Sequence, residues 1–262
     1  MNRDYNKKTK VKRIYVSKRE PVNTAEIRMA VNAQSLNIFN FTQNKGDMCY
    51  YVDSSLTKAE IKKIYNIGFE GTDYVSEKFL NGFGHSLLPV ILDDNSETAT
   101  SANWGLIPFW SKDRNIQKQT LNAKIETIAE KPSFRESINR RCLVLVKGFY
   151  EWKWLDDKGK QKHKHFLRLP DQDIMALGGI YSRWNDKVTG EELTTFSIVT
   201  TQANELMAQI HNTKHRMPVI LPGRMQQEWL GERGIQDFAF PNHEAELIAV
   251  KLDEPFEPST LF

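Results

Sequence analysis

The sequence of 262 residues predicts an α+β fold: a mostly antiparallel, barrel-like β core with peripheral helices, in a single domain. Three observations predict this class. Four strand-like runs, rich in apolar and aromatic residues, follow one another between residues 142 and 201. Short turn sequences separate them, which favours antiparallel pairing of neighbours. Segments that begin with helix-capping residues lie before and after these runs.

The elements that precede the four runs are a helix, a strand and a loop. Thr57 and Glu60 form a capping box, which predicts a helix that extends to Asn66. The apolar run LLPVIL at residues 87–92 predicts a buried strand. The polar sequence DDNSETATSAN, residues 93–103, predicts a loop.

A second capping box, Ser133 with Glu136, follows Pro132 and predicts a helix that ends near Arg140 and Arg141. The strand-like runs come next, and two short helical segments close the pattern. The predicted strands are residues 142–154, 163–169, 174–184 and 194–201, the turns are residues 156–159 and 185–186, and the helices are residues 203–210 and 225–233.

Composition excludes several classes of protein. A hydrophobic fraction of 40% with 11% aromatic residues is ordinary for a globular protein. Two cysteines do not make a disulfide framework, so we expect a cytoplasmic protein rather than a secreted one. No apolar run approaches the roughly 18 residues that a membrane span needs. His163 and His165 alternate on a predicted strand, and two histidines do not complete a zinc site.

The charge is unevenly distributed along the chain. The net charge is +3, but residues 1–20 alone contribute +6, so the other 242 residues carry −3. We interpret residues 1–48 as a basic, weakly ordered extension that lies upstream of the true start or is removed, and residues 49–262 as the domain. The extension is either a solvated tail or a segment with affinity for nucleic acid.

The dipeptide Met48-Cys49 opens the domain-like part of the sequence. If the chain begins at Cys49, this residue carries a free α-amine beside its thiol. Such an aminothiol condenses with an aldehyde through its amine, and the thiol then closes a five-membered thiazolidine ring on the same carbon. Taken by itself, without further motifs, Cys49 is best interpreted as a buried small hydrophobic residue.

Together with Met48-Cys49, three further segments resemble the SOS-response-associated peptidase family: WGLIPFW (104–110) with NAKIETIAEKPSFR (122–135), CLVLVKGFYEW (142–152), and FSIVTTQANELMAQIHNTKHRMPVIL (196–221). The resemblance implies a protein that traps abasic sites in single-stranded DNA as a covalent DNA–protein cross-link. It implies no metal and no organic cofactor, and we expect a monomer.

The resemblance also implies the working residues. The nucleophile is Cys49, Glu151 helps to open the sugar ring, and His211 and Asn122 handle protons and orientation. Contacts to DNA are implied at Phe109, Trp110, Lys124, Thr200 and Arg216. Arg135, Arg140 and Arg141 are further candidates for a basic surface that follows the DNA backbone.

The sequence departs from the family pattern at four places, and the largest departure is the 48-residue extension, which while attached converts the α-amine of Cys49 into an amide. Tyr50 and Tyr51 follow Cys49 where Gly-Arg is usual, so an arginine that contacts phosphate is missing. Lys124 replaces an arginine, which keeps the charge but loses the bidentate geometry. The loop NTKHRMP after His211 is longer than usual, which bears on the assignment of Arg216 as a DNA contact.

Each candidate also has a structural interpretation. Glu151 lies between Tyr150 and Trp152, where a carboxylate is either ion-paired with a lysine or is a general acid/base whose pKa is raised by apolar neighbours. His211 follows a predicted helix, where a histidine is favourable at the helix dipole. Asn122 is a good helix N-cap. Cys142 and Trp104 are predicted to be core residues.

Two other functions fit the same residues. One is a cysteine peptidase that acts on other proteins, whereas self-processing, by attack of the Cys49 thiol on the Met48 carbonyl, accompanies the cross-linking function. The other is a noncovalent binding module for single-stranded or modified DNA, in which Phe109 and Trp110 stack on bases and Cys49 has no chemical role.

Overall fold

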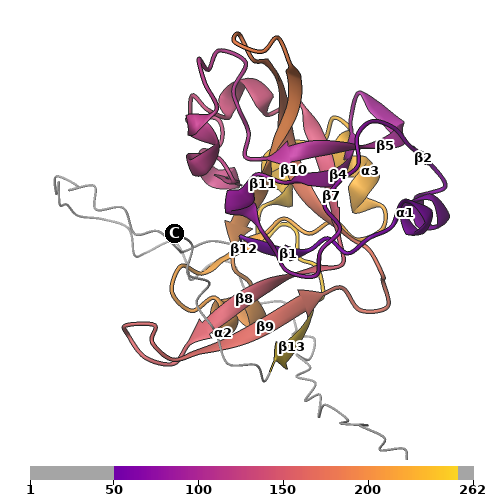
Figure 1. The fold of residues 1–262 in the computed structure, drawn as a ribbon. Helices are drawn as coiled ribbons and strands as arrows, with labels where there is room; N and C mark the ends of the chain where they lie inside the picture. Colours follow the sequence, from indigo (N-terminus) through magenta and orange to yellow (C-terminus); the bar gives the residue numbers. More distant parts are fainter. Residues whose placement is uncertain (1–49, 253–262) are drawn as a thin grey trace, which may run out of the picture.

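A closed β-barrel forms the centre of the molecule in the computed structural model, which describes residues 50–252. Its strands follow the order β11-β10-β7-β4-β5, and β5 pairs again with β11 through Thr195↔Asn103 and Phe196↔Trp104. This closing pair is parallel, and the other four are antiparallel (Figure 1). The strands are β4 (Leu87–Leu92), β5 (Asn95–Trp104), β7 (Arg141–Val146), β10 (Met175–Asn185) and β11 (Glu192–Gln202).

Three short strands extend the barrel sheet. β6 and β12 pair with β11, and β2 pairs with β5. β6 is parallel to β11 and β12 is antiparallel to it. β6 pairs with residues 198–200 and β12 with residues 200–202, so both lie at the same end of β11. Their bounds are β2 (Gly68–Phe69), β6 (Asn122–Lys124) and β12 (Arg216–Pro218).

A second, five-stranded antiparallel sheet packs beside the barrel in the order β13-β9-β8-β1-β3. The sequence 142–154 was predicted as one strand, but it forms β7 in the barrel and β8 in this sheet. The chain changes sheets at Lys147, whose N–H donates to the Asp53 carbonyl at 2.7 Å. The strands are β1 (Tyr51–Asp53), β3 (Leu80–Asn81), β8 (Gly148–Trp154), β9 (Lys162–Arg168) and β13 (Ile248–Leu252).

The helices within residues 50–252 are short and peripheral. The capping box predicted at Thr57 and Glu60 is present, and Asn66 ends the helix in the left-handed conformation. They are α1 (Lys58–Tyr65), α2 (Glu205–Ile210) and α3 (Met225–Leu230), with 3₁₀ turns at Gly82–Gly84, Asn115–Gln119, Ile125–Thr127, Arg135–Ser137 and Ile235–Phe238. None of the helices in this part of the chain has the length and apolarity to cross a membrane.

Two predicted elements are wrong. The polar sequence 93–103 is mostly strand β5 instead of a loop. Its threonines favour extended backbone, and its hydroxyls find partners, as where the Ser101 Oγ donates to the Thr72 carbonyl at 2.9 Å. The predicted helix at Ser133–Arg141 is only a 3₁₀ turn, because bonds such as Ser137 N to Phe134 O span three residues.

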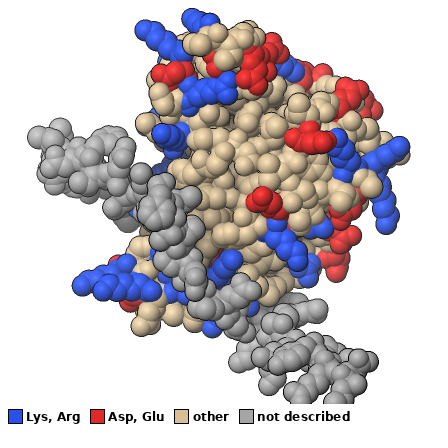
Figure 2. Space-filling model, in the orientation of Figure 1, with Lys and Arg blue, Asp and Glu red and all other residues tan. Residues whose placement is uncertain are grey.

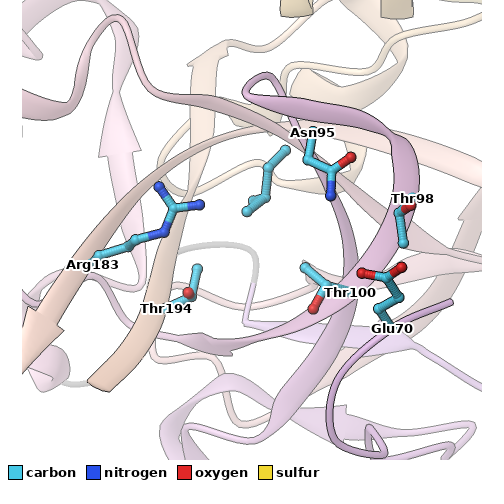
Figure 3. A pocket seen from close by; sticks show the side chains of 7 residues that line it. Glu70, Asn95, Thr98, Thr100, Arg183 and Thr194 are labelled. Atoms are coloured by element: carbon cyan, nitrogen blue, oxygen red, sulfur yellow. The ribbon is translucent and has the colours of Figure 1, made fainter. Parts of the chain in front are cut away.

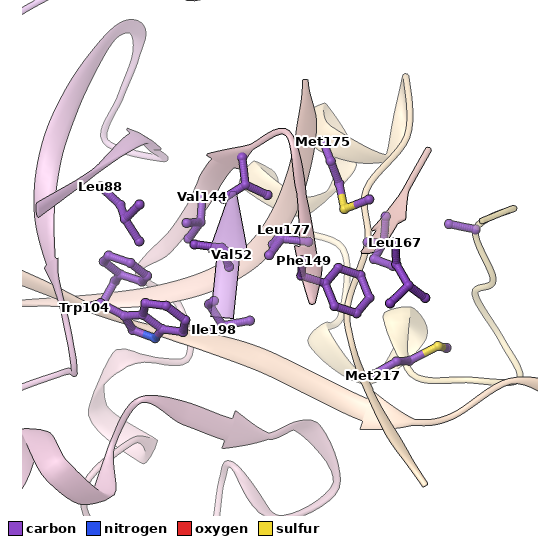
Figure 4. Packing of buried hydrophobic residues seen from close by; sticks show 14 of the residues in the cluster. Val52, Leu88, Trp104, Val144, Phe149, Leu167, Met175, Leu177, Ile198 and Met217 are labelled. Atoms are coloured by element: carbon purple, nitrogen blue, oxygen red, sulfur yellow. The ribbon is translucent and has the colours of Figure 1, made fainter. Parts of the chain in front are cut away.

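One of the two buried hydrophobic clusters in the described residues joins the barrel to the inner face of the five-stranded sheet. Val52, Phe149 and Leu167 from the sheet pack with barrel residues such as Val144 and Leu177 (Figure 4). Trp104 and Cys142 are fully buried, as predicted. Burial raises the pKa of the Cys142 thiol well above its ordinary value, which makes it an unreactive core group. The predicted fold class, α+β with a mostly antiparallel barrel-like core, is therefore confirmed.

Candidate active site

Three of the predicted catalytic side chains lie buried in the described structure. Asn122 opens β6, Glu151 is in the middle of β8, and His211 follows the last residue of α2. Their exposed fractions are 5%, 4% and 3%. The fourth, Cys49, lies outside the described residues, as do residues 1–48 and their predicted boundary.

Glu151 faces inward because β8 alternates between two environments. Phe149, two residues earlier, is fully buried in the core, so Glu151 emerges on the same side of the sheet. It pairs across the sheet with His165 of β9, which is also buried. Burial lowers the pKa of His165, so that ring stays neutral near pH 7. Glu151 thus lies in a region from which water is largely excluded.

The start of the described chain runs beside Glu151. β1 is antiparallel to β8 with Tyr51 opposite Tyr150, so the next position toward the N-terminus adjoins Glu151. The carbonyl of Tyr50 accepts a hydrogen bond from Gly82 N at 2.8 Å, which fixes the backbone there. The described chain therefore begins next to Glu151.

Hydrogen bonds within α2 and from the neighbouring Asn212 hold the backbone around His211 in place. Asn204 caps the N-terminus of α2 by accepting from Met207 N at 2.9 Å, and His211 N donates to the Met207 carbonyl at 2.7 Å. Next to it, the Asn212 side chain exchanges two hydrogen bonds with the backbone of Trp154, at 3.0 and 2.9 Å. These bonds fasten the end of α2 to β8, against which α2 packs (Figure 1).

The ring of His211 has a defined tautomer. Its Nδ1 lies 2.9 Å from the carbonyl oxygen of Arg216. A carbonyl can only accept, so Nδ1 carries the proton that is donated to it. In the neutral ring Nε2 then holds the lone pair, and it can accept a proton from a reacting group. The predicted position at a helix C-terminus is confirmed, and the hydrogen bond gives the ring an orientation that a helix dipole alone would not.

Asn122 lies at the start of β6 and pairs with Ile198 of β11. The alternative interpretation as a helix N-cap is wrong, because the next 3₁₀ turn is capped at Lys124 without a side-chain bond. The preceding residue, Leu121, accepts a hydrogen bond from Trp104 Nε1 at 2.8 Å. A fully buried tryptophan therefore fixes the backbone that presents Asn122.

Arg216 and Thr200, which were predicted as DNA contacts, belong to a buried network. Arg216 donates two hydrogen bonds to the carboxylate of Glu126, at 2.8 and 2.9 Å, and another to the Thr200 carbonyl at 2.7 Å. Arg216 is 8% exposed and Thr200 is fully buried. A direct contact of either side chain with DNA stays a prediction; in the structure they join β11, β12 and the turn after β6.

The carboxyl of Glu126 responds to this network. Partial burial by itself raises its pKa, but the hydrogen bonds and charge of Arg216 oppose this, and the net pKa is lowered. Because the carbonyl of Arg216 accepts from His211, the Glu126–Arg216 pair also fixes the group that sets the His211 tautomer.

Phe109 and Trp110 lie in an exposed loop, as predicted, with 60% and 47% of their surface exposed. A turn between Pro108 and Ser111 presents them, and Trp184 Nε1 anchors it by donating to the Ser111 carbonyl at 2.8 Å. Because both rings are exposed, they can stack on a flat aromatic partner.

The predicted basic residues divide into exposed and buried groups. Lys124, Arg135 and Arg140 are exposed. Arg141 is not part of the basic surface: it is 5% exposed and donates to the carbonyls of Trp229 and Arg233 at 3.3 and 2.6 Å. In Figure 2, Lys and Arg side chains lie mainly around the rim of the visible face, and a broad central area carries no charge.

Sequence reasoning missed an aromatic and basic cluster on the outer face of the five-stranded sheet. Tyr51, Phe79 and Trp152 form ring contacts there, and Lys164 lies over the Phe79 ring. The signal was present in the sequence as aromatic residues at every second position of 150–154 and lysines at 162 and 164. The strand registers are needed to recognise that these alternate positions lie on one face of the sheet.

A cavity of about 180 Å³ opens elsewhere, between β5, β10 and β11 (Figure 3). Its polar lining includes Glu70, Asn95 and Arg183, and none of the predicted site residues contributes to it. The residues of the candidate active site therefore lie outside this cavity.

The closed mixed barrel, the second sheet and the buried Asn122, Glu151 and His211 can now be compared with those of known protein families. The family described as SOS response associated peptidase (SRAP) matches residues 48–253. This match covers most of the chain, and the chain therefore belongs to that family, as the motifs predicted.

Characterised relatives share this part of the sequence. The abasic site processing protein YoqW of Bacillus subtilis (strain 168) is 40% identical over 149 residues, which are 56% of this chain and 64% of YoqW. The abasic site processing protein HMCES of Gallus gallus is 31% identical over 196 residues, or 65% of this chain and 55% of that protein. The matched part of the chain thus spans between about half and two thirds of the length of these relatives.

Solved structures show the same fold. A protein from Bacteroides thetaiotaomicron superposes with a TM-score of 0.68 at 36% identity, covering 77% of this chain and 91% of the other. A protein from Bordetella bronchiseptica, at 19% identity and a TM-score of 0.64, shares the fold.

Proposed function

We propose that this protein captures abasic sites in single-stranded DNA by forming a thiazolidine between Cys49 and the sugar aldehyde. The observation that carries the proposal is the register of β1 on β8, which brings the start of the described chain beside the buried Glu151. Membership of the SRAP family and the names of the relatives, abasic site processing proteins, support it.

The chemistry begins with the closed sugar. An abasic deoxyribose is mostly a cyclic hemiacetal, and opening it moves one proton from O1′ and another to O4′. Glu151 is placed for this transfer, because its carboxyl group is buried on β8 beside the end of β1. The product is a free aldehyde at C1′.

Capture follows in two bond-forming steps. The Cys49 amine adds to C1′, and loss of water gives a Schiff base. The Cys49 sulfur then bonds to C1′, the imine nitrogen becomes a secondary amine, and the thiol proton returns to the nitrogen. His211 Nε2 accepts and returns protons in these steps, and Asn122 orients the amine or the sugar by hydrogen bonding.

This chemistry requires a free α-amine, so we propose that the active form begins at Cys49. While residues 1–48 are attached, the nitrogen of Cys49 is an amide and cannot form a Schiff base. Self-processing would use the same groups, with the Cys49 thiol attacking the Met48 carbonyl. Intact-mass measurement of protein made from the full sequence tests the step directly, and a species that keeps residues 1–48 yet forms the adduct would exclude the mechanism.

The decisive experiment compares chains that begin at Cys49, with and without Cys49→Ala. We expect the cysteine form to give an adduct with abasic single-stranded DNA that survives heat and SDS, and to give none with intact DNA. The alanine variant is expected to retain only a Schiff base that borohydride can trap. A heat-stable adduct of the alanine variant would identify another nucleophile, and a complex that SDS dissolves would favour noncovalent binding.

A further inference from the structure

The outer face of the five-stranded sheet has an unusual composition. On this face, β8 presents Tyr150, Trp152 and Trp154, because Phe149 and Glu151 point to the other side. When one face of an antiparallel sheet packs on the core, the opposite face normally carries polar residues. Here the side that faces away from the core is aromatic, which requires a separate explanation.

The rings on this face form one connected surface. Tyr51 stacks on Phe79, with centroids 4.6 Å apart and an interplanar angle of 16°. Trp152 meets Tyr51 edge-on at 5.0 Å, and Tyr150 meets Phe79 edge-on at the same distance. Phe79 is 40% exposed, so the cluster ends in a ring that solvent reaches.

Two lysines of β9 lie next to the aromatic rings of this face. The register of β8 on β9 places Lys164 opposite Trp152 and Lys162 opposite Trp154. Lys164 Nζ lies 3.8 Å from the centroid of Phe79, and Lys162 Nζ lies 4.5 Å from the ring of Trp154. The residues of β8 and β9 that share this face, positions 150–154 and 162–168 taken alternately, include no carboxylate.

The aromatic rings and lysines on this face together indicate the kind of partner that it can bind. Aromatic rings stack on nucleobases whatever their sequence, and adjacent ammonium groups attract the phosphates between them. A second copy of the chain would place the same lysines against each other, and the basic residues 1–20 would meet them with like charge. A polyanion with exposed bases is complementary in both respects.

We propose that the outer face formed by Tyr51, Phe79, Trp152, Trp154, Lys162 and Lys164 is a stacking platform for single-stranded DNA that flanks the captured site. Trp152 follows Glu151 directly, and Tyr51 is two residues from Cys49, so the platform begins at the edge of the candidate active site. As a flank of the abasic site it rests on the proposed function; as a surface for single-stranded DNA it is tested separately.

The test uses the full chain and intact oligo-dT, which has no abasic site and forms no adduct. Fluorescence anisotropy compares wild type with Phe79→Ala and Lys164→Gln. We expect each variant to bind roughly tenfold more weakly, in the range of one lost stacking contact. Phe79→Trp is expected to retain or tighten binding, which separates stacking from damage to the fold.

Matched controls come from α1. Ile64→Ala removes an apolar side chain of similar exposure, 47%, and Lys58→Gln removes a lysine that lies 4.8 Å from the ring of Phe69. Both are expected to bind as wild type. Wild-type affinity in Phe79→Ala and Lys164→Gln would overturn the platform, as would a change in self-association, measured by sedimentation, without a change in DNA binding.

Photo-cross-linking locates the bases directly. With iodouracil in the oligonucleotide, we expect adducts on the peptides that contain Phe79 and Trp152. Adducts confined to the peptide with Phe109 and Trp110 would overturn the platform. Because this binding needs no aldehyde, loss of covalent capture would leave the result intact, and loss of the platform would leave capture of a short abasic oligonucleotide intact.

Discussion

The two faces of β8 place different chemistry one residue apart. On the inner face, Phe149 is fully buried and Glu151 is 4% exposed, beside the end of α2. On the outer face, Trp152 and Trp154 are partly exposed and lie opposite lysines. The strand period of two produces this division, because adjacent side chains must point to opposite sides.

The difference in burial suits the faces to different tasks. Glu151 is shielded from bulk water, which suits a group that must exchange protons with the substrate rather than with solvent. The outer face keeps contact with solvent, where lysines remain charged and bases can enter. Changes on the inner face should therefore alter the rate of capture, whereas changes on the outer face should alter affinity.

The largest expected effect comes from Glu151→Gln. The amide keeps the shape of the side chain but cannot transfer a proton, so capture should slow by about 10²–10⁴-fold while affinity for DNA changes little. Single-turnover cross-linking across pH, with binding measured separately, checks both. If Glu151 and His211 share the proton transfers, the wild-type rate is bell-shaped in pH, and Glu151→Gln or His211→Ala removes one limb.

The matched change on the other face is Lys164→Gln, which should leave the single-turnover rate at saturating DNA unaltered. Should Glu151→Gln cross-link at the wild-type rate, Glu151 would be a structural ion-pairing residue, and the proposed division of tasks between the faces would fail.

A second effect, on stability, is expected from Glu126→Gln. The substitution leaves the nearly buried Arg216 with a neutral partner, and we expect the free energy of unfolding to fall by about 1–2 kcal/mol, less than for a fully buried pair because Glu126 is partly exposed. Asp73→Asn is the control, since Asp73 pairs with Lys58 but is 88% exposed, and it should change stability by less than about 0.5 kcal/mol.

The pH dependence has a definite sign. The pKa of folded Glu126 lies below the ordinary value of 4.5, so the folded state holds the charged form more strongly than the unfolded state does. Its contribution is present above pH 4.5 and is lost as the pH falls through the lower, folded pKa. Urea unfolding on either side of this range should show a smaller acid loss for Glu126→Gln than for wild type. An equal loss would assign the acid sensitivity to other carboxyls.

Much of the fold was predictable because it follows local rules. The capping box at Thr57, the alternation of strands and turns after residue 142, and the burial of Trp104 each depend on neighbours in sequence. Residues 93–103 were not predictable in this way, because their polarity concealed a strand whose hydroxyls are satisfied by distant partners. The break at Lys147 also depends on a long-range bond, to the Asp53 carbonyl.

The site shows the same limit. The sequence motifs identified Asn122, Glu151 and His211, but not the tautomer of His211, which depends on the Arg216 carbonyl. The motif also indicated Arg216 as a DNA contact, whereas its partner Glu126 is 90 positions away in sequence. The aromatic outer face became visible only through the registers that join β1, β8 and β9.

A third prediction concerns the exposed loop on the barrel. Phe109→Ala and Trp110→Ala should each weaken binding of single-stranded DNA by about 1–3 kcal/mol, with little dependence on sequence, because stacking discriminates poorly between bases. Val188→Ala, at a position that is 93% exposed in the β10–β11 turn, is the control and should have no effect. Anisotropy with oligo-dT and oligo-dA measures both properties. A strong sequence preference in the wild type would argue against stacking as the main contact.

The smallest expected effect is on salt dependence and comes from Lys124→Ala. Lys124 is exposed at the end of β6, two residues after Asn122, and we therefore expect it to contact a phosphate of bound DNA. Each lost phosphate contact on single-stranded DNA lowers the slope of log affinity against log salt by about 0.7. Lys124→Ala should flatten the slope by that amount, whereas Lys187→Ala, in the distant β10–β11 turn, should leave it unchanged. Phe79→Ala should weaken binding at every salt concentration without changing the slope. An unchanged slope in Lys124→Ala would show that this lysine is solvated in the complex and that the charge kept by replacing arginine does not reach the phosphate.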